Sequence, residues 1–179
     1  MLSSISMINF GVSMRIGFGI DVHCFGDGDH IMLGGVKIPH HRGIIAHSDG
    51  DVLVHALCDA LLGSLSLGDI GQHFPDTDQQ FSKIDSLLLL KKVLFLVRNK
   101  GYLIANIDAT VLAQRPKIAS FIPSMQKKLS DLLGVDSEQI SIKATTTEKL
   151  GFVGREEGIE AHCAVLVLKE KNVATHGTI

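Results

Sequence analysis

The sequence has few cysteines, almost no net charge and no apolar segment long enough to cross a membrane. The three cysteines, Cys24, Cys58 and Cys163, are odd in number and show no CxxC spacing, which is typical of a reduced intracellular protein. Lys and Arg total 17 against 19 Asp and Glu, so there is no basic surface for nucleic acid or an anionic membrane. We therefore expect a cytoplasmic protein that binds neither nucleic acid nor membrane.

The chain is long and apolar enough to form one domain. It has 179 residues, of which 45% are hydrophobic, and this excludes an intrinsically disordered protein. Residues 1–13 lack the basic start of a signal peptide, and we expect them to form a loose tail. Residues 171–179 also have the composition of a tail, which leaves a single domain over 14–170.

Alternating and helical patterns predict an α+β fold. Strands are predicted over 14–22, 104–113, 140–145 and 159–168, and a hairpin over 31–38 turns at Gly34 and Gly35. Helices are predicted from Ser48 or Asp49 to about Leu65, over 82–100 and over 116–133. The run 164–168 is apolar on both faces, so both faces need cover. We expect two layers, a mixed β-sheet with helices packed on one face and a second subunit on the other.

Asp21, His23 and His55 form a candidate metal site. Asp21 and His23 are two apart in a strand, so their side chains leave the same face. One carboxylate and two imidazoles give zinc three ligands and leave the open position that a catalytic site needs. The alternative is a polar strand end and a core histidine with satisfied hydrogen bonds.

Two further segments are suited to phosphate. His47 directly precedes the predicted helix start, where free N–H groups bind anions. Thr145, Thr146 and Thr147 follow a strand, and the next residue, Glu148, could ligate magnesium beside a phosphate. The alternatives are an ordinary capping residue and a Thr-rich turn. The segment 113–117 places a proline and cations after a strand, which alone is a weak signal for a nucleotide.

Taken in order, these strings resemble the 2-C-methyl-D-erythritol 2,4-cyclodiphosphate synthase family over residues 14–169. The matching strings include Asp-Val-His at 21–23, His-Ser-Asp-Gly-Asp at 47–51, Leu-Gly-Asp-Ile-Gly at 67–71, Phe-Pro-Asp-Thr-Asp at 74–78 and the stretch 143–155. Several distinct strings in one order are much more specific than any single motif.

The resemblance implies a cyclising, CMP-releasing phosphorus–oxygen lyase of the non-mevalonate isoprenoid route. The 2-phosphate of 4-diphosphocytidyl-2-C-methyl-D-erythritol 2-phosphate attacks the β-phosphorus, and CMP leaves. The family is homotrimeric, with active sites between subunits. One zinc ion per subunit is held by the residues matching Asp21, His23 and His55, and Mg²⁺ or Mn²⁺ on the substrate diphosphate is held with help from Glu148.

The resemblance also assigns roles to other residues. His47 and Thr146 match positions that stabilise the transition state. Phe152 and Arg155 match positions near the trimer axis. The expected substrate-binding residues include these two and also Ser48 and Asp59. Asp59 could orient His55 or bind a substrate hydroxyl. The methylerythritol segment matches Asp69, Ile70, Gly71, Phe74, Pro75, Asp76, Thr77 and Asp78. The cytidine and phosphate contacts match Ala113, Gln114, Arg115, Pro116, Lys117, Ile118, Ala119, Thr145, Thr146, Thr147 and Glu148.

The chain departs from the family pattern at two positions, and two other functions fit the same residues. Arg115 stands where a small residue is usual, and His162 where some relatives have an acid, which affects nucleotide contacts and the central channel. The same three metal ligands would serve a zinc phosphoester hydrolase with Asp49, Asp51 or Asp59 as the base. A closed fourth metal position would instead indicate a non-catalytic trimeric binding protein.

Overall fold

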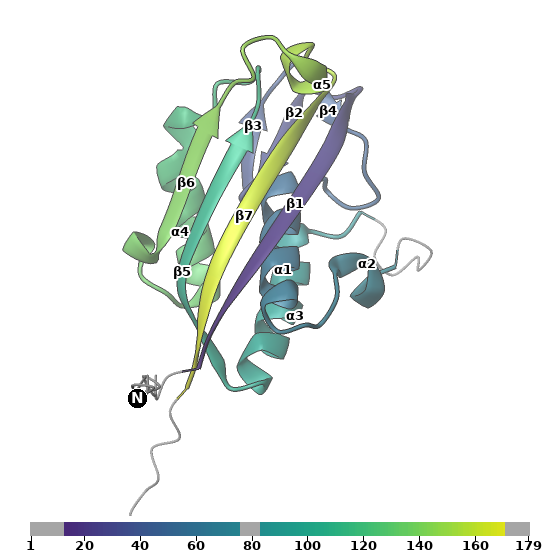
Figure 1. The fold of residues 1–179 in the computed structure, drawn as a ribbon. Coiled ribbons are helices and arrows are strands. Elements are labelled where there is room, and N and C mark those ends of the chain that lie inside the picture. Colours follow the sequence, from purple (N-terminus) through teal and green to yellow (C-terminus); the bar gives the residue numbers. More distant parts are fainter. Residues whose placement is uncertain (1–12, 76–82, 171–179) are drawn as a thin grey trace, which may run out of the picture.

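A five-stranded mixed sheet runs through the molecule (Figure 1). The computed structural model describes residues 13–75 and 83–170; the two predicted tails (apart from Ser13) and Asp76, Thr77 and Asp78 lie outside these ranges. Strands β5 and β6 pair in parallel, and all other neighbours in this sheet pair antiparallel. The sheet order is β4 (Gly43–Ile44), β1 (Met14–Gly26), β7 (Gly158–Lys169), β5 (Tyr102–Leu112) and β6 (Ile140–Thr145).

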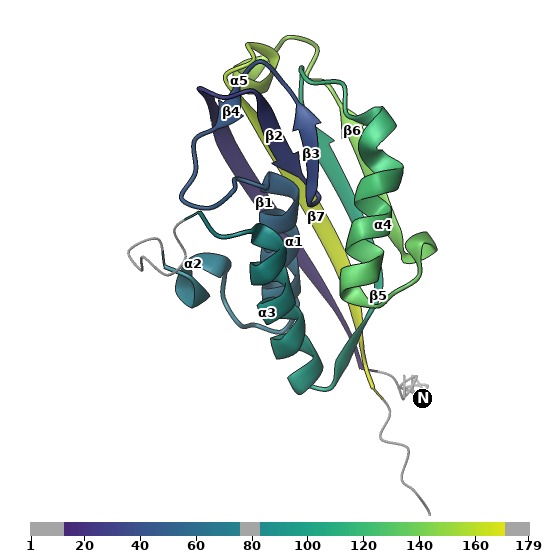
Figure 2. The same ribbon diagram turned by 180° about the vertical axis from the view of Figure 1, so that it is seen from behind.

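The long helices cover one face of this sheet, as Figures 1 and 2 show from opposite sides. They are α1 (Val52–Ser64), α3 (Ser86–Asn99) and α4 (Ile122–Leu133). The hairpin of β2 (His30–Leu33) and β3 (Val36–Pro39) lies on the same side of the sheet. Shorter elements are α2 (Ile70–His73), α5 (Gly151–Gly154), η2 (Ala119–Phe121) and η3 (Ser137–Gln139). The predicted α+β fold with a mixed sheet is confirmed.

Two glycines allow helix α1 to lie directly against strand β1. A Cβ atom on Gly17 would stand 1.8 Å from the carbonyl oxygen of Ala60, and one on Gly19 would stand 2.1 Å from that of Ala56. No side chain fits in that space, which is the reason for glycine at a close backbone approach. The contact places the end of β1, with Asp21 and His23, beside the first turns of α1.

The other sheet face is uncovered in the single chain and is apolar along β1 and the second half of β7. On β7 the odd-numbered residues from 159 to 167 are buried and the even-numbered ones are partly exposed. On β1 the even-numbered residues Met14, Ile16, Phe18, Ile20 and Val22 are between 45% and 74% exposed. The residues of the run 164–168 alternate between the two faces as predicted, but the uncovered face of β7 also carries Glu160 and His162. Only the odd-numbered face of β7 has its cover within this chain.

Three predicted helix starts differ from the structure. Helix α1 is capped by Asp51 rather than by Ser48 or Asp49, because the fully buried Asp51 carboxylate accepts hydrogen bonds from the backbone N–H groups of Val54, Gly34 and Gly35 at 3.0, 2.9 and 2.6 Å. These bonds also tie the hairpin to the helix.

The other two helices begin later in the chain than predicted. Helix α3 begins at Ser86, where Asp85 accepts a hydrogen bond from Leu87 N–H; the predicted start at 82 lies outside the described residues. Helix α4 begins at Ile122 rather than at Pro116, because Pro123 occupies its first turn and a 3₁₀ segment precedes it. Within the described residues no helix is long and apolar enough to span a membrane.

Candidate metal centre

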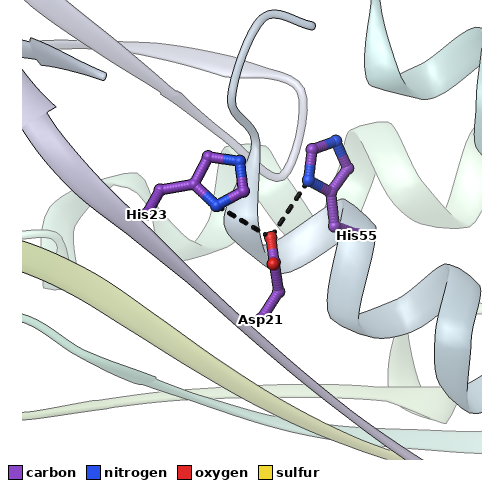
Figure 3. A group of neighbouring side chains, drawn as sticks. All are labelled: Asp21, His23 and His55. Atoms are coloured by element: carbon purple, nitrogen blue, oxygen red, sulfur yellow. Dashed lines mark hydrogen bonds and ion pairs between the residues drawn. The ribbon is translucent and has the colours of Figure 1, made fainter. Parts of the chain in front are cut away.

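Asp21, His23 and His55 converge between β1 and α1 (Figure 3). Nδ1 of His55 lies 3.0 Å and Nδ1 of His23 lies 3.1 Å from the same carboxylate oxygen, Oδ2 of Asp21. One potential ligand atom from each residue lies within 4.8 Å of the others. The predicted convergence of these three residues is confirmed.

The Asp21 carboxylate and the His23 imidazole shift each other's protonation. Burial alone would raise the pKa of Asp21, but the facing rings of His23 and His55 outweigh this effect and hold the pKa far below its usual range. Burial likewise opposes the charged form of His23, and the Asp21 carboxylate outweighs it and raises the pKa of that imidazole. Asp21 is therefore a permanent anion in this site, which suits a cation shared by the three side chains.

The donor set fits a divalent metal ion. Nδ1 of His23 is buried and, among the described residues, has no aligned hydrogen-bond partner: its 3.1 Å approach to Asp21 is an ion-pair contact. A buried ring nitrogen without a hydrogen bond is costly unless an ion takes its lone pair. One carboxylate and two imidazoles match the three-ligand sets of catalytic zinc sites.

The three residues line a cavity of about 340 Å³, which we call the metal cavity. Five predicted substrate or transition-state residues share it: His47, Ser48, Ile70, Gly71 and Phe74. The sequence analysis missed five lining residues: Val22, Ile45, Ala46, Ile84 and Leu89. The metal cavity therefore combines a polar side with an apolar side.

His47 offers an unused polar atom to this cavity. Its Nε2 is buried and has no hydrogen-bond partner within the described part of the chain. The ring lies before the start of α1, where the first backbone N–H groups have no partners in the helix. An imidazole nitrogen there could donate to a phosphate oxygen.

Asp59 supports the cavity wall rather than hydrogen-bonding to His55. Its Oδ1 accepts a hydrogen bond from the backbone N–H of Ile70 at 2.7 Å, which fixes the start of α2. Burial raises the pKa of the Asp59 carboxyl, and that hydrogen bond partly opposes the shift. Asp69 caps α2 through Gln72 N–H and is exposed, while Pro75 is exposed at the edge of the described range.

The predicted cytidine and phosphate segments lie at another place. They follow the parallel strands β5 and β6, and the N–H of Ala113 donates to the carbonyl of Thr145 at 3.0 Å. The residues 145–148, which we call the threonine turn, are largely exposed, and Thr146 Oγ1 donates to Glu148 Oε1 at 2.6 Å. The side-chain oxygen of Gln114 is buried without a hydrogen-bond partner among the described residues.

The structure does not bring these segments to the metal cavity of the same chain. No residue of 113–119 or of the threonine turn lines it. Phe152 and Arg155 lie on and after α5, also away from the cavity lining, and Arg155 pairs with Glu157 at 2.9 Å. The departure Arg115 is exposed, and His162 contacts Glu160 at 2.6 Å on the uncovered side of β7.

The sequence analysis did not predict that Ser86 and Asp49 hold the ring of His55. Ser86 Oγ lies 2.8 Å from Nε2 of His55, and the same hydroxyl makes a short hydrogen bond to Asp49. Ser86 comes from α3, 31 positions after His55, so no local spacing could reveal the contact.

Comparison with known proteins identifies the family of this chain. A model of the YgbB family matches residues 14–168. The chain belongs to the YgbB family. This confirms the family predicted from the motifs, because its curated relatives carry the name 2-C-methyl-D-erythritol 2,4-cyclodiphosphate synthase. The YgbB relative from Ectopseudomonas mendocina is 61% identical over 87% of this chain and 99% of its own, and that from Azotobacter vinelandii is 59% identical over the same shares.

Solved structures of this family share the YgbB fold described above. The structure of the bifunctional IspDF from Campylobacter jejuni has a TM-score of 0.85 and 46% identity, covering 88% of this chain and 43% of that one. The structure described as IspF (Plasmodium falciparum) CDP complex has a TM-score of 0.78 and 37% identity, covering 88% of this chain and 97% of that one.

Proposed function

We propose that this protein is a 2-C-methyl-D-erythritol 2,4-cyclodiphosphate synthase of the non-mevalonate isoprenoid route. The observation that carries the proposal is identity of 57–61% to synthases of that name over nearly their whole length. The convergence of Asp21, His23 and His55 at the metal cavity supports it. The substrate is 4-diphosphocytidyl-2-C-methyl-D-erythritol 2-phosphate. A solved relative described as a CDP complex supports a cytidine nucleotide.

The reaction is a phosphoryl transfer within one molecule. An oxygen of the 2-phosphate forms a bond to the β-phosphorus, the bond from that phosphorus to the bridging oxygen breaks, and CMP leaves with the electron pair. Such a transfer requires the reacting groups to be held in line and their negative charge to be neutralised, with little covalent work for the protein. The described site has no need of a nucleophilic serine or cysteine.

The residues of the metal cavity would hold and neutralise the phosphates. Asp21, His23 and His55 would hold zinc, which supplies positive charge to a phosphate oxygen when bound. The free Nε2 of His47 supports its role as a hydrogen-bond donor to the charge that develops on the β-phosphate. Ile70, Gly71 and Phe74 would hold the methylerythritol part, since they form the wall beside the ligands.

The threonine turn and residues 113–119 would serve the cytidine and its phosphates. Glu148, exposed beside Thr146, has a free carboxylate edge for a Mg²⁺ or Mn²⁺ ion that arrives with the diphosphate. Thr146 would donate to a phosphate oxygen. These residues and the metal cavity are separate within one chain, which supports an active site completed by a neighbouring subunit.

The uncovered apolar sheet face supports a homotrimer. Ile16 and Phe18 are 74% and 59% exposed, and Leu166 on the next strand is partly exposed beside them. An apolar face of this kind is normally covered in the working protein. Ile16→Asp should convert a trimer into monomers in analytical ultracentrifugation. Phe95→Asp, a matched change at a 63% exposed residue of α3, should leave it intact. A monomeric wild-type protein would contradict the trimer.

The activity test separates cyclisation from hydrolysis. Purified protein, the diphosphocytidyl substrate and Mg²⁺ should yield CMP and the cyclic diphosphate in equal amounts, with no oxygen-18 taken up from labelled water. An open-chain product carrying oxygen-18 would show a phosphoester hydrolase instead. The predicted location in the cytoplasm stays a prediction.

A further inference from the structure

The imidazole of His55 is held on both sides. Nδ1 faces Oδ2 of Asp21 at 3.0 Å, and Nε2 faces Ser86 Oγ at 2.8 Å. The Ser86 hydroxyl in turn makes a short hydrogen bond to Oδ1 of Asp49. A chain of polar groups therefore runs from Asp49 through Ser86 to the side of the ring that faces away from Asp21.

The chemistry of these groups determines which atom donates and which accepts in each hydrogen bond of this chain. A neutral imidazole has one donor and one acceptor nitrogen, and a metal ligand must offer its lone pair. If Nδ1 faces the metal position, Nε2 carries the hydrogen and Ser86 accepts it. The single hydroxyl hydrogen of Ser86 then goes to Asp49, which as a carboxylate can only accept.

Asp49 is itself held in the orientation that this chain needs. Its backbone N–H donates to the carbonyl of Ile84 at 3.1 Å. Its Oδ2 accepts from the backbone N–H of Ser86 at 3.2 Å, and its Oδ1 accepts from that of Asp51 at 3.3 Å. Both carboxylate oxygens thus act as acceptors. An asparagine amide in place of Asp49 would either point its NH₂ group at another hydrogen-bond donor or force the Ser86 hydroxyl to accept instead of donate.

Burial makes the arrangement specific. Ser86 has no exposed surface and His55 is 6% exposed, so water is not at hand to replace the hydroxyl. Ser48 Oγ also lies 3.2 Å from Nε2, but it is farther away, accepts from the N–H of Gly50 and lines the metal cavity. Ser86 is the nearer partner.

We infer that Ser86 and Asp49 are positioning residues for the metal ligand His55. They hold its ring in the form with hydrogen on Nε2, so that the Nδ1 lone pair points to the position shared with Asp21 and His23. The inference rests on the proposed metal site. Residues behind a metal-binding histidine that orient it in this way typically contribute 10–100-fold to metal affinity.

The test measures zinc affinity in competition with a chromophoric chelator. Ser86→Ala and Asp49→Asn should each weaken zinc binding by about 10–100-fold. Asp85→Asn is the matched control. It also replaces one carboxylate by an amide, at the N-terminal cap of α3, the helix that carries Ser86, and asparagine caps a helix as well as aspartate does. Its zinc affinity should equal that of the wild type, and thermal unfolding without metal should show that the variants are folded.

A second measurement does not depend on any variant. In the zinc-loaded wild type, nitrogen-15 NMR of the histidine rings should show His55 bound through Nδ1 with a slowly exchanging hydrogen on Nε2. Zinc bound through Nε2, or undiminished affinity in folded Ser86→Ala, would overturn the inference. A wild-type protein that binds no zinc would instead overturn the proposed metal site.

Discussion

The metal cavity and the threonine turn carry the two sets of predicted site residues, and they differ in how completely one chain builds them. The cavity brings together residues from β1, the loop before α1, α1, α2 and α3, and its ligand His55 is held by the buried Ser86. The threonine turn is largely exposed at the end of β6, with Glu148 in the left-handed region at φ 51°. A complete cavity at one place in the chain and an open turn at another are what a site shared between subunits requires of each chain.

The largest expected effect is the loss of a metal ligand. His55→Ala should remove zinc and lower kcat by about 10³-fold, since a metal contributes several kcal/mol of charge stabilisation. Elemental analysis and steady-state kinetics measure both effects. His30→Ala, on β2 outside the cavity lining, is the control and should keep its zinc. Unchanged zinc in His55→Ala would show that the ligand set is wrong.

The next effect concerns the fold beneath the cavity. Asp51→Ala leaves the backbone N–H groups of Val54, Gly34 and Gly35 without their carboxylate, and buried unsatisfied groups are costly. We expect the free energy of unfolding to fall by about 3 kcal/mol, measured by urea denaturation. Asp69→Ala removes an exposed cap and should cost less than about 1 kcal/mol. Equal losses of unfolding free energy in the two variants would show that the hydrogen bonds from Gly34 and Gly35 of the hairpin to Asp51 contribute nothing to stability.

A smaller effect is expected at the threonine turn. Glu148→Gln should lower kcat by about 30-fold by removing one carboxylate from the diphosphate-bound ion. Zinc content should stay at the wild-type level, because Glu148 does not line the metal cavity. Raising the Mg²⁺ concentration should recover part of the activity. Loss of zinc in this variant would show that the threonine turn and the metal cavity do not bind separate metal ions.

The smallest effect is expected at the wall of the cavity. Asp59→Asn keeps an oxygen for the N–H of Ile70 but weakens the hydrogen bond that fixes α2. We expect KM to rise by about tenfold, with kcat and zinc nearly unchanged, since lost binding in the ground state appears in KM. A loss confined to kcat would indicate that Asp59 acts on the reacting groups.

The sequence predicted the residues of the metal centre better than their surroundings. Asp21 and His23 follow from strand alternation, and the contact with α1 through Gly17 and Gly19 brings them to His55. Ser86 could not be predicted, because its contact with His55 depends on how α3 packs on α1. The helix starts were less predictable, since Asp51 and Asp49 are equally good caps and only the contact with the hairpin distinguishes them.

Mixing two inactive subunits tests most directly whether the two regions of neighbouring chains form one active site. Asp21→Ala lacks a working cavity and Glu148→Gln lacks a working turn, but a mixed trimer would pair an intact cavity with an intact turn from its neighbour. Co-expressed at equal levels with different tags, the two variants should give about a quarter of wild-type cyclase activity by random assembly of a closed ring. Mixed trimers with no more activity than the average of the two variants alone would contradict a shared active site.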